Sequence, residues 1–338
     1  KWLYLLLVIW MGWGAFSAIN GWLGSHLPLR DVLGDYRRLY IYALALLAPL
    51  GLPLYWKHLR ELKWVFIVGG IGAILYGLYR GATGHYYHDT LEHNEFPRLL
   101  SDDEIVTLAI ALAYMTALAL FEKGLWRRGA AVGFGVLCAA FMMMSGWRMG
   151  FLHMIMAPAL VLFFLSRMRH LPFGRILINL ILVGFVGVSG LLVGAFVFKD
   201  MSHRIWKKME DRMDRQGAPI VGGKDMRYFA YKEAVTRFVQ HPVLGTGLGD
   251  ELTYPKMGSD GAFIYVSGTT HNLFLDVLYQ TGPFGLLIFL ILHGILCRCA
   301  LRAIRRAPPE HQPFIVTIFT GYICTMVHYC YEPTGVSG

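Results

Sequence analysis

Nine long runs of apolar residues constrain this chain more than any other feature of its sequence. A helix needs about 20 apolar residues to cross the hydrocarbon core of a bilayer, and in lipid it must pair every backbone polar group internally. The runs lack the alternating polarity of barrel strands. The sequence therefore predicts an all-α integral membrane protein, a polytopic bundle of about nine transmembrane helices. The expected spans are 2–18, 39–56, 64–79, 105–121, 129–145, 151–165, 176–198, 272–296 and 314–331.

The composition agrees with a membrane protein. Hydrophobic residues make up 56% of the chain and charged residues only 16%, whereas an average soluble domain carries about 25% charged residues. The 31 Lys and Arg outnumber the 22 Asp and Glu. In a membrane protein this excess is typical of cytoplasmic loops, so we expect contact with membrane lipids and no nucleic acid. The five cysteines lie inside or at the end of apolar runs, which predicts neither a disulfide framework nor a cysteine zinc site.

The loops between the runs predict the orientation of the chain. Short basic loops at 57–63, 122–128, 167–175 and 298–312 alternate with less basic or longer segments at 81–104, 145–150 and 199–270. The positive-inside rule assigns the first set to the cytoplasm, although Arg30, Arg37 and Arg38 in the first outer loop depart from it. We therefore expect three parts: seven transmembrane helices in 1–198, a large helical periplasmic loop in 199–270, and two C-terminal transmembrane helices in 271–338.

The large polar segment divides further. Its first part, 199–215, is densely charged and predicts an amphipathic helix on the membrane surface. Residues 227–240 have helical spacing, with an expected apolar face of Tyr231, Ala234, Val235 and Phe238, and His241-Pro242 ends the helix. The glycine-rich run 243–250 is not a phosphate-binding fingerprint, because no strand precedes it and no Lys-Ser/Thr follows.

Two short motifs outside this segment have the composition of metal sites. His85, His88 and His93 are spaced like metal ligands or are solvated loop histidines, and we favour the second interpretation. The run 101–104, Ser-Asp-Asp-Glu, resembles a paired-carboxylate site but also fits a capping box. Because an apolar helix follows at once, the capping box is the better interpretation. We expect no metal site.

The strongest candidates for a functional site lie at span ends on the outer side. His271 and Asn272 mark the point where the polar segment meets a span, and an ionisable group there is a functional candidate. Asp276 follows about one turn later and orients the imidazole, pairs with a buried arginine or is satisfied by a neighbouring hydroxyl. Arg148 lies in the tight corner 145–150, and Arg80 lies at the outer end of the third span. Helix capping for the histidine and lipid anchoring for the arginines are the alternatives.

Several of these residues together resemble the O-antigen ligase and O-antigen polymerase superfamily. The resemblance rests on Arg227, on His241-Pro242-Val243-Leu244-Gly245-Thr246-Gly247, on His271-Asn272 and on Gly282 with Gly285. The corner 145–148 is similar to a Ser-Arg-Gly turn of that family, although Met149 separates Arg148 from Gly150. The resemblance covers about residues 140–300. It implies about twelve spans and a large periplasmic loop, so we expect two spans before Lys1 and one after Gly338.

The resemblance also implies an activity. Members transfer glycans in the periplasm from an undecaprenyl-diphosphate carrier, and the ligases use the lipid A-core as acceptor. It implies functional roles for Arg148, Arg227 and His271, and a weaker one for Arg80. We expect a cofactor-free glycosyltransferase of the bacterial inner membrane in which arginines bind the diphosphate and His271 acts as the base. The alternatives are an O-antigen polymerase, a protein O-oligosaccharyltransferase and a transporter of lipid-linked oligosaccharides.

Overall fold

The chain folds into two compact units in a computed structural model. The first unit combines Lys1–Pro53, Ile220–Leu301 and Tyr329–Gly338, and the second combines Leu54–Pro219 with Arg302–His328. The structure describes residues 2–36, 59–83, 100–122, 124–144, 148–169, 184, 226–257, 263–268, 270, 272–308 and 310–331.

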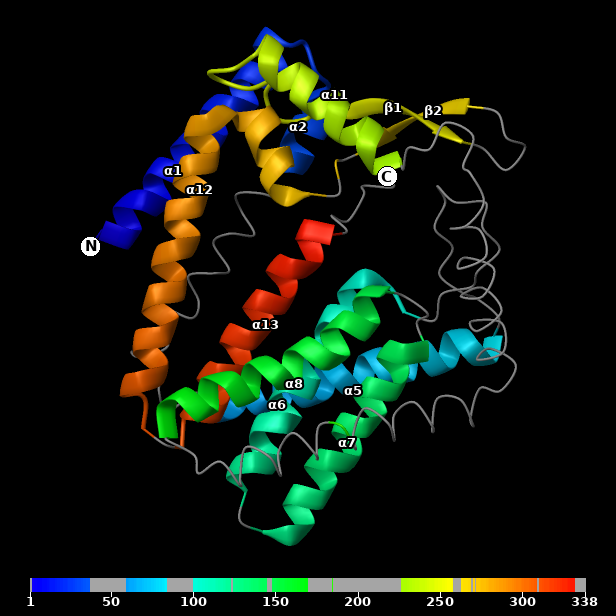
Figure 1. Ribbon diagram of the computed structural model, residues 1–338, viewed down its shortest axis with the longest axis vertical. Helices are drawn as coiled ribbons and strands as arrows, with labels where there is room; N and C mark the ends of the chain where they lie inside the picture. Colours follow the sequence, from blue (N-terminus) through cyan, green and yellow to red (C-terminus); the bar gives the residue numbers. More distant parts are fainter. Residues whose placement is uncertain are drawn as a thin grey trace. The chain divides into compact units, whose positions relative to one another are not determined.

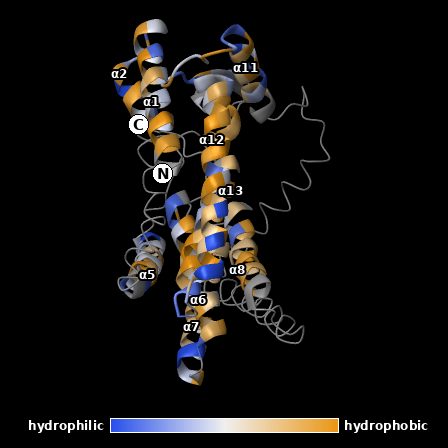
Figure 2. Ribbon diagram, turned by 90° about the vertical axis from the view of Figure 1, so that its left-hand side faces the viewer, coloured by the Kyte–Doolittle hydropathy of each residue, from blue (hydrophilic) through white to orange (hydrophobic). Residues whose placement is uncertain are grey.

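Seven of the nine predicted spans coincide with helices of the described residues (Figure 1). They are α1 (Trp2–Ile19), α5 (Leu59–Thr83), α6 (Asp102–Phe121), α7 (Leu125–Met144), α8 (Arg148–Arg169), α12 (Leu273–Arg306) and α13 (Gln312–Tyr331). The expected spans 39–56 and 176–198 lie outside the described residues, apart from Gly184. Five of the described helices are long and apolar enough to cross a membrane, and hydrophobic residues predominate along them (Figure 2). The protein is thus an all-α polytopic membrane protein, as predicted.

Helix α6 is the centre of the second unit and packs against α5, α7 and α8. Four of its alanines are completely buried, namely Ala109, Ala111, Ala113 and Ala117. Small side chains let neighbouring helices approach closely, which is how helices associate in lipid. Tyr114 of α6 contacts Phe66 of α5 and Phe314 of α13, with ring centroids 5.3 and 5.5 Å apart.

The predicted capping box at the start of α6 is confirmed. The Ser101 N–H donates to the Glu104 carboxylate at 2.6 Å, and the Ile105 N–H donates to the Ser101 carbonyl at 3.1 Å. Glu104 is therefore used in ending the loop and beginning the helix, which is the interpretation that the sequence favoured.

In the first unit, α1 and α12 run side by side in opposite directions (Figure 1). Trp10 contacts Phe289 and Trp13 contacts Phe284, with ring centroids 5.6 and 5.7 Å apart. After α1 the chain forms a π-helical turn, η1 (Asn20–Gly24), and a short helix, α2 (Leu29–Tyr36). The C-terminal end of α1 and the N-terminal part of α12 consequently lie together.

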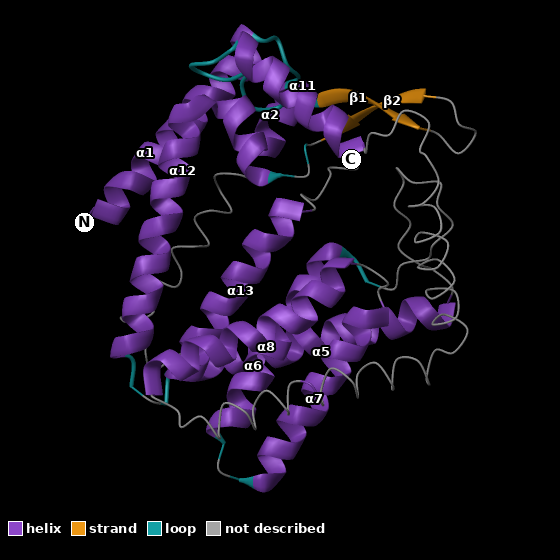
Figure 3. Cartoon of the chain, viewed as in Figure 1, coloured by secondary structure: helices purple, strands orange, loops and turns teal. Residues whose placement is uncertain are grey.

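The polar segment before α12 contains a helix and a hairpin (Figure 3). Helix α11 (Met226–Gln240) confirms the predicted helix and its end before His241. Strands β1 (Leu252–Met257) and β2 (Phe263–Gly268) pair in antiparallel fashion, which the prediction of a helical loop missed. The signal was present, because β-branched and aromatic residues flank a Gly-Ser-Asp-Gly run at 258–261. The expected surface helix at 199–215 lies outside the described residues.

The predicted apolar face of α11 was partly wrong. Tyr231 and Val235 are 36% and 50% exposed. Ala234 and Phe238 of the predicted face do pack inward, together with Ala230, which the prediction left out. Ala230 and Ala234 join Leu252, Tyr254 and Tyr279 in one cluster, and Phe238 packs against it. Alanines carry little weight in a hydrophobic pattern, yet they bring the α11 backbone close to β1.

Helix α12 differs from the predicted continuous span 272–296 in two ways. It extends to Arg306, because its last turns are amphipathic and bury Ile304. It is also interrupted at Gly282, where φ is 72° and ψ is 178°. The rings of Phe274 and Phe289 are consequently only 6.0 Å apart, whereas an unbroken helix would separate the two residues by roughly 22 Å. We call Leu273–Thr281 the short segment of α12.

Candidate functional site

The start of α12 is fixed by Asn272, one of the predicted site residues. Its side-chain oxygen accepts the N–H groups of Phe274 and Leu275 at 3.1 and 3.3 Å, and its carbonyl accepts the N–H of Asp276 at 2.9 Å. These are the contacts of a helix N-cap. The capping role that the sequence left open for His271 is therefore filled by its neighbour.

Asp276 is buried one turn into the helix, with 4% exposure. Its Oδ1 accepts the Thr270 N–H at 3.0 Å and the Thr270 hydroxyl at 2.8 Å. The hydroxyl oxygen of Thr270 in turn accepts the N–H of Asn272 at 3.1 Å. Asp276 thus bonds to a neighbouring hydroxyl, which is one of the expected arrangements. His271 itself lies outside the described residues, but the residues on both of its sides are anchored to α12.

The charge of Asp276 matters at this point of the helix. The N-terminal end of a helix carries a partial positive charge, which disfavours a cation and is offset by a carboxylate in the first turn. Burial raises the pKa of Tyr254, and the negative charge of Asp276 raises it further. A buried carboxyl group therefore lies beneath the start of α12.

The break at Gly282 releases the carbonyl groups of the last turn of the short segment. Gly282 leaves the helical conformation and Pro283 has no N–H, so Tyr279, Gln280 and Thr281 lose their usual helical donors. Other parts of the first unit replace those donors. The N–H groups of Thr246 and Gly247 donate to the carbonyl groups of Tyr279 and Gln280 at 2.9 and 3.0 Å. The Trp13 indole N–H donates to the Thr281 carbonyl at 3.0 Å.

The donors at the break come largely from the glycine turn, residues 243–250. Gly245, Gly247 and Gly249 have φ values of 71°, 96° and 87°, which side-chain-bearing residues rarely adopt. A Cβ atom at Gly245 would lie 2.6 Å from the carbonyl oxygens of Tyr279 and Gln280. The glycines therefore allow main chain to lie directly on main chain.

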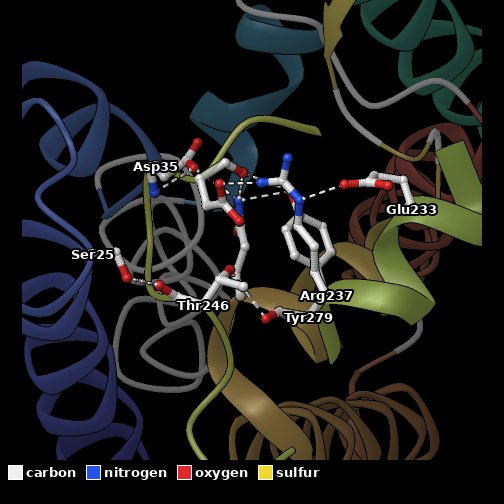
Figure 4. A network of polar contacts seen from close by, with 9 residues as sticks. Ser25, Asp35, Glu233, Arg237, Thr246 and Tyr279 are labelled. Carbon is white, nitrogen blue, oxygen red and sulfur yellow. Dashed lines mark hydrogen bonds and ion pairs between the residues drawn. The ribbon is translucent and has the colours of Figure 1, made fainter. Parts of the chain in front are cut away.

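A network of polar side chains joins this turn to its surroundings (Figure 4). Arg237 of α11 pairs with Glu233 at 2.9 Å and also with Asp250 of the glycine turn. The Tyr279 hydroxyl donates to the Asp250 carbonyl at 2.9 Å, and the Ser25 hydroxyl donates to the Thr246 carbonyl at 2.8 Å. Helix α11, the glycine turn and the short segment of α12 are consequently held as one piece.

The predicted arginines are distributed over both units. Arg80 belongs to the second unit, where its guanidinium pairs with Glu104 at 2.9 Å and lies 4.2 Å from the Tyr76 ring centroid. Its side chain is only 11% exposed. Arg148 begins α8, also in the second unit, and Arg227 lies in the first turn of α11 in the first unit. The side chains of Arg148 and Arg227 lie outside the described residues.

Within the described residues no group of three or more His, Cys, Asp or Glu side chains could hold a metal ion. The candidate ligands His85, His88 and His93 lie outside those residues. Sequence reasoning did not identify Thr270, Gln280 or Asp35 as contributors to this region. These residue types do not mark a functional site by themselves. Asp35 and Gln280 contact each other across a large distance in sequence, and Thr270 contacts Asp276 in an arrangement that matches no known motif.

These features define a class of protein: a multi-pass membrane protein whose polar segment is built onto a broken helix. The O-antigen ligase family model matches residues 133–290, from α7 to the long part of α12. This match supports membership of the O-antigen ligase superfamily. A comparison with curated proteins found no match.

The match points to a glycosyltransferase-like membrane enzyme of O-antigen transfer in lipopolysaccharide biosynthesis. The match includes the glycine turn, Asn272 and the break at Gly282. The main-chain contacts at Gly245 and Gly282 give a physical reason for glycine at these two motif positions.

Proposed function

We propose that the chain transfers an O-antigen-type glycan from an undecaprenyl-diphosphate carrier to the lipid A-core. In this proposal it works in the bacterial inner membrane, with its active site facing the periplasm. The observation that carries the proposal is the fixed start of α12, where Thr270 and Asn272 hold the chain on either side of His271. This region lies inside the segment that matches the O-antigen ligase family.

His271 acts as the general base in this proposal. The acceptor hydroxyl gives its proton to the imidazole as its oxygen bonds to the anomeric carbon. The bond from that carbon to the phosphate oxygen breaks, and the diphosphate leaves with the electron pair. Attack from the opposite face inverts the anomeric centre. Asp276 supports the base, since its negative charge offsets the helix end and stabilises the imidazolium that forms.

Arginines neutralise the leaving diphosphate without a metal ion. A guanidinium presents a planar fork of donors that binds two phosphate oxygens at once. Preorganised donors of this kind stabilise the charge that develops in the transition state. We assign this role to Arg148 and Arg227, with the smallest share for Arg80, because Arg80 already pairs with Glu104.

A transporter of lipid-linked oligosaccharides is the competing candidate, and the broken helix α12 favours it. In transporters, the ends of broken helices line a cavity and bind the substrate. Here the carbonyl groups of Tyr279, Gln280 and Thr281 already accept hydrogen bonds from Thr246, Gly247 and Trp13. The break therefore serves internal packing, which supports the enzyme.

Transfer between purified components tests the proposal. The protein is reconstituted in vesicles with an undecaprenyl-diphosphate-linked glycan and offered lipid A-core, a second lipid-linked repeat unit or an acceptor protein. Glycan attached to lipid A-core is the expected product. Product found only on the repeat unit or the protein would make the chain a polymerase or a protein O-oligosaccharyltransferase. Movement of intact lipid-linked glycan across the bilayer without transfer would make it a transporter.

The orientation is tested by labelling single cysteines in a background without the native ones. Tyr265 of β2 is 76% exposed, and the Glu310 side chain, before α13, is 62% exposed. We expect a membrane-impermeant thiol reagent added to the periplasmic side to label Tyr265→Cys and to leave Glu310→Cys unlabelled. Labelling of both variants from that side would contradict the topology.

A further inference from the structure

A buried carboxylate joins the N-terminal part of the chain to the broken helix. Asp35, in α2, is 9% exposed. Its Oδ2 accepts the Gly249 N–H and the Gln280 side-chain amide, each at 3.0 Å. The bonds therefore connect α2 to the glycine turn and to the short segment of α12, which both lie more than 200 positions further along the chain.

The rest of α2 indicates that this contact is specific. Only Val32 and Asp35 of the helix are buried, whereas Leu33 is 53% exposed. Val32 lies against Gly249, where a Cβ atom would come within 2.7 Å of the Val32 nitrogen. Burying a carboxylate costs several kcal/mol unless hydrogen bonds compensate. A short helix that uses one of its two buried positions for a carboxylate is held by the hydrogen bonds of that group.

The short segment of α12 transmits this contact toward His271. At 1.5 Å per residue the segment is about 13 Å long, and it is fixed at both ends. Asp276 binds Thr270 near its beginning, and Asp35 binds Gln280 near its end. The orientation of the segment determines where Thr270 and Asn272, the neighbours of His271 in the sequence, lie. A misplacement of about 1 Å can reduce a rate roughly a hundredfold.

We propose that Asp35, which lies outside the segment matching the O-antigen ligase family, is a positioning residue for glycan transfer. It acts by fixing Gln280 and the glycine turn, and it has no contact with substrate. This inference rests on the proposed function, since it takes His271 as the base. It adds that the N-terminal segment up to α2 is part of the machinery that holds this base in place.

The test compares two aspartates of the same helix in the full chain, reconstituted with the lipid-linked donor and lipid A-core. Asp35→Ala leaves the Gly249 N–H and the Gln280 amide without their acceptor. Asp31→Ala removes the same charge one turn earlier, at an exposed position. We expect Asp35→Ala to lower kcat about 10- to 100-fold, with KM for the donor within about twofold, and Asp31→Ala to change neither. The inference is overturned if Asp35→Ala behaves like Asp31→Ala.

Asp35→Asn and Gln280→Met separate positioning from folding. Asp35→Asn keeps an oxygen that can accept both hydrogen bonds, so we expect most of kcat to return. Gln280→Met keeps the size of the side chain and loses the amide. Its kcat defect should resemble that of Asp35→Ala, and the double variant should add little to it, because both changes remove the contact between Asp35 and Gln280. If Asp35→Ala does not reach the membrane, Gln280→Met alone decides, and wild-type kcat for that variant overturns the inference.

His271→Gln, measured in the same vesicles, separates this inference from the proposed function. If His271→Gln retains activity, His271 is not the general base, whatever the rates of the two aspartate variants are. If His271→Gln is inactive and Asp35→Ala and Asp31→Ala have equal rates, only the inference about Asp35 is contradicted.

Discussion

The two units of the protein hold their helices together in different ways. In the second unit regular helices pack through small and apolar side chains, as at Gly70, where an added Cβ would lie 2.9 Å from the Ala111 Cβ. In the first unit, backbone groups at a glycine turn and a helix break are held by individual hydrogen bonds. Apolar packing tolerates exchanges of similar volume, whereas each hydrogen bond in the first unit depends on one donor and one acceptor. The first unit is therefore suited to hold a reacting group at a defined position.

The largest expected effect follows from placing the reacting group in the first unit. General-base assistance contributes about 10²- to 10⁴-fold to a rate, so His271→Ala should nearly abolish transfer while donor binding persists. His271→Gln keeps a hydrogen-bonding side chain but accepts no proton at neutral pH, and it should be almost as inactive. Wild-type activity should fall as acid protonates the imidazole, because the protonated ring is no base. Rates of transfer against pH provide the measurement.

Near wild-type activity of His271→Gln would contradict this assignment. The difference between the two units would then concern packing alone, and the base would have to come from another residue.

A smaller effect is expected at the arginines, one in each unit. Arg148→Lys and Arg227→Lys keep the charge but lose the planar fork of donors. A charge-assisted hydrogen bond is worth about 1.5–3 kcal/mol, so each variant should lose roughly 10- to 100-fold in rate. Arg128→Lys, in the first turn of α7, is the control and should transfer at the wild-type rate. Steady-state rates with the lipid-linked donor measure the loss.

The arginine series also tests how far the chemistry is confined to the first unit. A defect in Arg227→Lys alone would confine it there. Wild-type rates for both variants would leave these arginines as membrane anchors.

A third prediction compares one glycine from each unit. Gly245→Ala places a methyl group against two carbonyl oxygens at φ 71°, and the left-handed conformation alone costs about 1–2 kcal/mol. Gly133 lies within α7, where a Cβ atom meets nothing within 4 Å, so Gly133→Ala should be neutral or stabilising by up to about 1 kcal/mol. Thermal unfolding in detergent should show a lower midpoint for Gly245→Ala and an unchanged or higher one for Gly133→Ala. Equal unfolding midpoints for the two variants would contradict the proposed difference in packing between the units.

The same distinction explains how much of the fold was predictable. Helices of the second unit follow from apolar runs, and α5, α6, α7, α8 and α13 lie where the sequence placed them. The capping box at Ser101 was equally readable, because both of its partners lie within one turn. The hairpin at 252–268 and the break at Gly282 had local signals as well, in turn residues and in a Gly-Pro pair, that a search for apolar runs passes over.

The candidate site was predictable only where its parts are local. Asn272 and Asp276 were recognised because they lie beside His271 at the start of a span. The contact of Asp35 with Gln280 joins residues 245 positions apart, and neither residue type marks a site by itself. The inward face of α11 was only partly assigned for a related reason: Tyr231 and Val235 are exposed, while Ala230, which the hydrophobic pattern did not mark, packs in the cluster.

The last prediction concerns metal removal, where no effect is expected. Arginines neutralise the diphosphate in the proposed mechanism, so transfer should continue at the wild-type rate in EDTA. The measurement is the rate of glycan transfer to lipid A-core before and after chelation. Lost activity that Mg²⁺ or Mn²⁺ restores would bring back the Asp102-Asp103 pair or the group of His85, His88 and His93 as ligands. These residues lie within the segment that forms the second unit. Essential chemistry would then reside outside the polar region of the first unit, and the contrast between a reacting unit and a packing unit would no longer hold.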